Sequence, residues 1–193
     1  SDFHSSIFSI VALYLFIFAI KSENNFAWFI LPVIMMFGFF SKQTPIAYII
    51  LIISFLSIIY FIKNFNINKI ICGFSGIVFS LSLILFYLIY NNINFDDFLV
   101  QNFLFPKTLG STRLEWLFPI EFKRFFLRFK LIYLSTFFLI LAYLKLVFLK
   151  QERDYKNKII LLSLYFSSIA FIVHQLMTIN AIFIYFLVPI MIG

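Results

Sequence analysis

Long runs without a formal charge alternate with short polar connections along this chain, and the lengths of the runs predict membrane-spanning helices. A helix needs about 20 predominantly apolar residues to cross a bilayer. The fifth run contains one charge, Lys145, which can reach the interface from a helix end. The predicted helical runs are Phe3 to Ile20, Asn24 to Ser41, Gln43 to Ile62, Ile70 to Phe95, Leu131 to Leu149 and Ile159 to Gly193.

The last run holds 35 residues and would be about 52 Å long as one helix. We therefore expect it to break at its polar group, which is His174, Gln175, Thr178 and Asn180. The fold class predicted is all-α: a single domain, 1–193, formed by a polytopic transmembrane bundle of six full spans plus the start of a seventh. Because the chain begins at Ser1 and ends inside an apolar run, we expect an internal fragment of a longer protein.

Composition agrees with this interpretation. Of 193 residues, 63% are hydrophobic and 12% charged, and the mean hydropathy is +1.04. A soluble domain carries about 25% charged residues, and a disordered chain is poor in apolar ones. Cys72 is the single cysteine, which excludes an internal disulfide and a cysteine-based metal site.

The net charge of +7 arises from basic residues that lie between apolar runs. Such placement fits phospholipid headgroups, so we expect membrane lipids and not nucleic acid as partners. No pattern in the chain indicates an oligomeric state.

Alternating spans place the connections 21–25, 63–69 and 150–158 on one face, and these short connections carry seven Lys or Arg residues. A high density of basic residues in short loops favours the cytoplasm. The opposite, extracytoplasmic face then receives the long loop 91–130. It also receives the unusual polar residues Asp2, His4, Lys42, Gln43, Arg113, His174, Gln175 and Asn180.

The long loop contains a mixed apolar and basic segment, 118–130, which predicts a helix lying in the interface. This helix could hold an anionic lipid or simply anchor the chain.

Asp96 and Asp97 begin the loop as adjacent carboxylates. They could bind a divalent metal, act as a base or be solvated, and the last interpretation is favoured.

Three local patterns predict packing or binding. Small and polar residues recur at helical spacing at Ser163, Ser167, Ala170, His174 and Thr178, so this stripe should face the bundle interior or an aqueous cavity. A second stripe of small residues, Cys72, Gly76 and Ser80, predicts a helix-packing face.

Thr44 is expected to cap a helix that starts at Pro45. Lys42, just before them, can be a boundary lysine or a cation for a lipid phosphate.

The order of several loose motifs resembles that of GT-C membrane glycosyltransferases, closest to the bacterial branch related to protein O-mannosyltransferases and the lipid A aminoarabinose transferase. An acidic residue, Asp2, precedes the first helix, and FGFFSKQTP ends a short apolar helix at Lys42. DDFLVQNFLFPKTLGSTR is similar to an aromatic loop with an arginine, Arg113. IFIYFLVPIMIG, with Tyr185 and Pro189, is similar to a later helix start. The chain departs from the family's common Lys-Gly at Lys42-Gln43.

The resemblance implies transfer of a sugar from a polyprenyl-phosphate carrier to an extracytoplasmic acceptor at a bacterial plasma membrane. It also implies that the principal catalytic acid lies upstream of Ser1, so no catalytic residue is assigned here. A divalent metal cofactor is left open, and no metal ligands are assigned. The candidate substrate-binding residues are Asp2, His4, Lys42, Arg113, His174 and Gln175.

Two other classes of function stay open. A membrane transporter or flippase for a lipid-linked or polar solute would also need polar residues inside a bundle, although no internal repeat is evident. A non-catalytic membrane scaffold is the third class.

Overall fold

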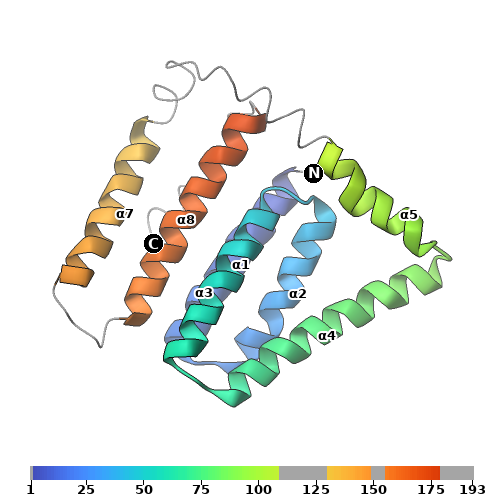
Figure 1. Ribbon diagram of the computed structural model, residues 1–193, viewed down its shortest axis with the longest axis horizontal. Helices are drawn as coiled ribbons and strands as arrows, with labels where there is room; N and C mark the ends of the chain where they lie inside the picture. The colour runs from blue at the N-terminus through green and yellow to red at the C-terminus, as the bar shows by residue number, and fades with distance from the viewer. Residues whose placement is uncertain (1, 109–129, 149–154, 179–193) are drawn as a thin grey trace.

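The computed structural model describes residues 2–108, 130–148 and 155–178, and the regular elements in these ranges are all helical (Figure 1). This confirms the all-α prediction for the part of the chain described. The helices are α1 (Asp2–Ser22), α2 (Asn25–Ser41), α3 (Ile46–Lys63), α4 (Ile67–Tyr90), α5 (Phe95–Leu99), the π-helical turn η1 (Val100–Leu104), α7 (Lys130–Phe148) and α8 (Tyr155–Thr178).

Four helices of the described ranges are long and apolar enough to cross a membrane, which is typical of an integral membrane protein. They are α1, α3, α4 and α8. The helix α2 and the segment Ile132–Phe148 of α7 are apolar but shorter. Many large apolar side chains on these helices are exposed, as expected where lipid is the solvent.

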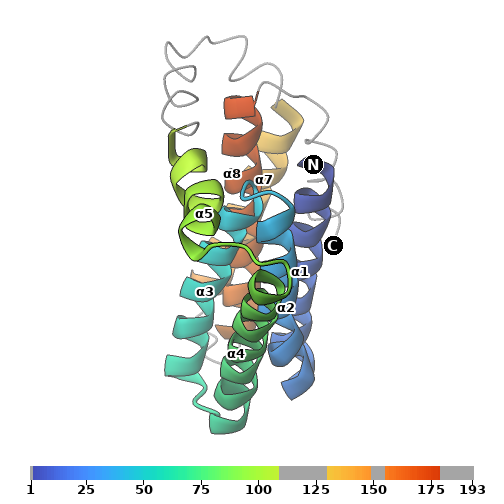
Figure 2. The same cartoon turned by 90° about the vertical axis from the view of Figure 1, so that its right-hand side faces the viewer.

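The helix α1 forms the centre of the bundle and contacts α2, α3 and α8. Its buried side chains, including Leu13, Phe16 and Ile20, pack with α2, α3 and α8 in one core. In Figure 1, α7, α8, α3 and α1 run roughly side by side, with α7 outermost. In Figure 1, the helix α4 inclines away from them. It contacts α2, in front of which it lies in the turned view of Figure 2.

A glycine allows this contact between α2 and α4. A β-carbon added at Gly76 would lie 2.3 Å from the backbone oxygen of Phe29 in α2. Ser80, one turn further on, is also buried, and Cys72 is half-buried. The predicted packing face along α4 is therefore confirmed.

The predicted polar stripe on α8 is confirmed as well. Ser163, Ser167, Ala170 and His174 are all buried in the bundle. The side chain of Thr178 lies outside the described part. A helix that presented these residues to lipid would leave polar groups without partners in an apolar solvent, so burial is the favoured arrangement.

Two predicted helix starts are wrong. The first turn of α3 begins after Pro45, not at it, and Thr44 does not cap the helix. Backbone carbonyls take that role, because Gln43 O and Pro45 O accept hydrogen bonds from the amides of Ala47 and Tyr48. The helix α4 begins at Ile67, before the predicted start at Ile70, and therefore includes Lys69.

The predicted end of the fourth span is also wrong. The helix α4 ends at Tyr90, and Asn92 adopts a left-handed conformation with φ of 52°. A new helix, α5, begins at Phe95 after the cap Asn94. Asparagine tolerates a left-handed backbone better than most residues do, so a turn forms although no charge interrupts the run.

The antiparallel helices create two distinct ends. At one end lie the start of α1, the junction of α2 with α3 and the last turn of α8 (Figure 1). We call this the Lys42 end. At the other end lie the connections from α1 to α2 and from α3 to α4, together with the start of α8. We call this the Glu23 end.

Candidate functional site

Lys42 lies at the junction between two apolar helices and is half-buried. It follows the last residue of α2, in an extended conformation that directs the chain into α3. Its carbonyl oxygen accepts a hydrogen bond of 2.8 Å from Ser5 Oγ in α1. The structure thus brings the Lys42 backbone and the first turns of α1 into direct contact.

The segment after α4 packs on the same junction. The side-chain amide of Gln43 donates a hydrogen bond from Nε2 to the backbone carbonyl oxygen of Asn102 at 3.5 Å. Phe40 contacts Phe98, and Phe39 contacts Phe103, with ring centroids 5.7 Å apart in both pairs. The predicted loop 91–130 therefore begins with helical turns that cover the end of α2 beside Lys42.

His174 and Gln175 are buried in the last turns of α8, also at the Lys42 end. Within the described residues, Gln175 Oε1 and Ser167 Oγ lie buried without a hydrogen-bond partner. Buried polar atoms are normally satisfied, so these atoms mark positions where a polar ligand or water would be stabilised. The helix also runs through both residues to Thr178, and any break in the run comes after it.

The other predicted site residues are only partly described. His4 is exposed in the first turn of α1 and lies with its ring edge-on to Phe3. Asp2 begins α1, but its side chain is outside the described part. Arg113, Asn180, Tyr185, Pro189 and most of the interfacial segment 118–130 also lie outside the described residues.

Asp96 and Asp97 are exposed in the first turn of α5. Carboxylates at this position interact favourably with the positive end of a helix, which agrees with the solvated interpretation. Among the described residues, no group of three or more His, Cys, Asp or Glu side chains could hold a metal ion.

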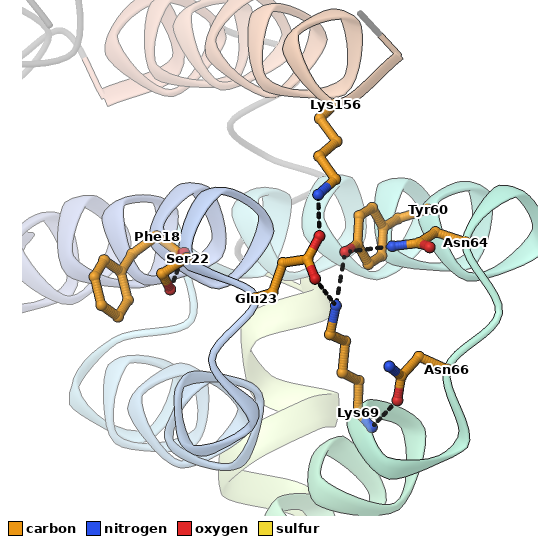
Figure 3. Close-up of polar contacts among 8 residues, drawn as sticks. All are labelled: Phe18, Ser22, Glu23, Tyr60, Asn64, Asn66, Lys69 and Lys156. Atoms are coloured by element: carbon orange, nitrogen blue, oxygen red, sulfur yellow. Dashed lines mark hydrogen bonds and ion pairs between the residues drawn. The ribbon is translucent and has the colours of Figure 1, made fainter. Parts of the chain in front are cut away.

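A polar cluster at the Glu23 end was not predicted. Figure 3 shows Glu23 between two lysines, Lys156 from α8 and Lys69 from α4. The carboxylate accepts a hydrogen bond from Lys156 and forms an ion pair of 3.7 Å with Lys69. Three segments distant in the sequence thus meet at one side chain.

Lys69 is only 2% exposed and has a second polar partner. Its Nζ donates to the hydroxyl of Tyr60 at 3.2 Å, and Asn64 Nδ2 donates to the same hydroxyl at 2.9 Å (Figure 3). Tyr60 is fully buried and stacks between Trp28 and Tyr155. A buried ammonium group needs this combination of charge and hydrogen bonds to offset the loss of water.

The electrostatic effect is visible at Glu23. The hydrogen bond from Lys156, followed by the positive charges of Lys69 and Lys156, lowers the pKa of the Glu23 carboxyl below its ordinary value. Glu23 also adopts φ of 56°, a left-handed conformation that is uncommon outside glycine, asparagine and aspartate.

The sequence contained one signal for this cluster. A charged residue normally ends an apolar span, so the sequence pattern places Lys69 in a connection. However, Asn66 is a good helix cap, and its side chain accepts a hydrogen bond from the Lys69 amide. A helix starting there carries Lys69 into the bundle, where the carboxylate of Glu23, in the α1–α2 connection, neutralises it.

Comparison of the chain with protein-family models, with curated proteins and with solved structures finds no match. The arguments for function therefore rest on the residues and their arrangement.

Proposed function

We propose that this chain is part of a membrane glycosyltransferase that takes its sugar from a polyprenyl-phosphate carrier and passes it to an extracytoplasmic acceptor. One observation carries the proposal. Lys42 stands half-buried where two apolar helices meet, at the end of the bundle that also holds the buried His174 and Gln175. The motif order described above supports the same class of enzyme.

Transfer of a sugar from a phosphate carrier is favoured by a cation beside the phosphate that leaves. As the acceptor oxygen bonds to the anomeric carbon, the bond between that carbon and the phosphate oxygen breaks, and polyprenyl phosphate leaves with its electron pair. Negative charge grows on this phosphate, and a fixed ammonium group near a low-dielectric surface stabilises it strongly. The resemblance assigns the acceptor's proton to an acidic residue outside this chain.

The surroundings of Lys42 also suit a lipid carrier. Phe40, Phe103 and Phe105 lie close to it in the sequence or on the segment that covers the junction, and all three are exposed. Exposed phenylalanine side chains beside a cation fit a ligand with a phosphate and a long isoprenoid tail. His174 and Gln175 are the groups proposed to bind the sugar or its phosphate from α8.

In the membrane, we propose six spans and the start of a seventh, with the Lys42 end outside a bacterial plasma membrane. The helix α2, with 17 residues, is about 26 Å long and can cross a hydrocarbon core of about 30 Å only with little tilt. The six described helices α1, α2, α3, α4, α7 and α8 would be the spans, and residues 181–193 the start of the seventh.

The test is Lys42→Ala in the full-length protein. We expect a loss of sugar transfer of about 10²-fold, because removal of one group that stabilises transition-state charge has effects of that size. Binding of polyprenyl phosphate alone, the part common to all such donors, should weaken as well. Lys107→Ala is the matched control, since Lys107 is exposed, and should keep both activities.

Unchanged transfer by Lys42→Ala would remove Lys42 from the site. A flippase would be favoured instead if the unmodified protein transferred no sugar but moved a polyprenyl-linked sugar across vesicle membranes, and if Lys42→Ala lost this movement.

A further inference from the structure

The Glu23 end carries a large excess of positive charge. The helix ends and connections at this end contain eight Lys or Arg residues and three acidic residues. The rest of the chain contains seven Lys or Arg residues and five acidic residues. Within the connection 149–154, two basic residues are matched by two acidic ones. The excess therefore comes from the lysines on the helices themselves, at Lys21, Lys63, Lys69, Lys145, Lys156 and Lys158.

Glu23 neutralises only part of this charge. Its carboxylate is bound by Lys69 and Lys156, and among the described residues of this end it is the only acidic side chain. Lys21, Lys63 and Lys145 are exposed in the last turns of α1, α3 and α7. In the part of the chain that the structure describes, none of the three forms an ion pair.

Large apolar side chains are exposed beside these lysines. Phe65 is 76% exposed two residues after Lys63, and Phe148 is 79% exposed three residues after Lys145. Phe26, in the first turn of α2, is 66% exposed. Lysines that alternate with exposed phenylalanines at the ends of apolar helices match the chemistry of a lipid interface, because ammonium groups bind phosphates and phenyl rings enter the acyl boundary.

From this arrangement we propose that Lys21, Lys63 and Lys145 bind the headgroups of anionic phospholipids, so that the Glu23 end faces the negatively charged, cytoplasmic leaflet. A zwitterionic headgroup carries its own ammonium group and would gain less from these three exposed lysines. This inference uses no residue of the Lys42 end. It shares with the proposed sugar transfer only the orientation of the chain in the membrane, so lipid binding and sugar transfer can fail separately.

The test uses the full chain in a neutral detergent, with short-chain phosphatidylglycerol and phosphatidylcholine as the two lipids, and counts bound lipid by native mass spectrometry. We expect phosphatidylglycerol to bind about fivefold more tightly than phosphatidylcholine, which is the contribution of one lysine near a membrane surface to one bound headgroup. In the variant Lys21→Gln/Lys63→Gln/Lys145→Gln, this preference should disappear, since all three ammonium groups are removed.

Lys107→Gln is the matched control and should keep the preference, since it removes an exposed lysine outside this end. A salt titration of the unmodified chain tests the same claim without any variant. The preference should fall at about 1 M salt, where charges are screened within about 3 Å. Equal binding of the two lipids by the unmodified chain, or an equal loss in the control, overturns the proposal.

Discussion

At the scale of single residues, Glu23 is the most unusual position described. It combines a left-handed backbone with a carboxylate shared by two lysines from different helices. A non-glycine residue holds such a backbone only where its surroundings impose it. Here Lys69 and Lys156 fix the side chain, so the conformation and the ion pairs depend on each other.

The first prediction concerns this cluster. Glu23→Gln should lower the thermal unfolding temperature of the detergent-solubilised chain, because Lys69 would remain buried without a carboxylate. Lys69→Met should lower the unfolding temperature by less, since it removes the buried charge and methionine fills a similar space. The double variant should be more stable than Glu23→Gln alone, and a double variant as unstable as the sum of both changes would contradict the account.

The pH dependence of stability should follow the same cluster. The pKa of Glu23 is lowered in the folded chain, chiefly by the Lys156 hydrogen bond, so the unfolded chain takes up a proton more readily. The stabilisation is therefore complete above the ordinary value of 4.5 and is lost as the pH falls through the lower folded value. Unfolding measured below pH 4.5 should show this loss, and Glu23→Gln should lack it.

At the scale of helices, the close contact of α2 and α4 yields a sharp prediction. Gly76→Ala should destabilise the chain by more than about 1–3 kcal/mol, the usual cost of overpacking, because the clash is with the backbone of Phe29. Gly73→Ala is the matched control, since its added β-carbon would be 3.9 Å from Trp28 O. The control should be neutral or stabilising by up to about 1 kcal/mol, as alanine favours a helix.

Thermal unfolding of both variants measures the difference. Equal stability of Gly76→Ala and Gly73→Ala would show that α2 and α4 do not approach each other at Gly76.

The sequence predicted which segments are helical better than it predicted where they end. Runs without charge located the helices and the spacing of Ser163, Ser167 and His174 predicted their burial, since both patterns are local. The start of α4 was missed because it depends on a distant partner, Glu23, for Lys69. The turn after Tyr90 was missed because asparagines, not charges, form it.

The candidate site was predicted only as a list of residues that share one end. The alternating direction of successive helices was sufficient to predict this shared end, because every second connection between antiparallel helices lies at the same end of the bundle. The contact of Ser5 with the Lys42 carbonyl and the packing of Asn102 beside Gln43 join segments 37 and 59 residues apart, and no local pattern encodes such contacts.

At the scale of the whole molecule, the two ends differ in chemistry. The Glu23 end presents lysines around an ion cluster in which Lys69 is buried and Glu23 is exposed, whereas the Lys42 end holds buried polar groups and one half-buried lysine. The proposed sugar transfer requires the Lys42 end to face the acceptor outside the membrane. The proposed lipid binding requires the Glu23 end to face the cytoplasm. Both proposals therefore depend on one orientation.

Cysteine labelling in intact bacterial cells tests this orientation most directly. In a Cys72→Ala background, Thr44→Cys reports the Lys42 end and Asn68→Cys the Glu23 end. A membrane-impermeant maleimide should modify the cysteine at position 44 in intact cells and the one at position 68 only after the cells are permeabilised. Modification at position 68 in intact cells, with position 44 protected, would contradict the account.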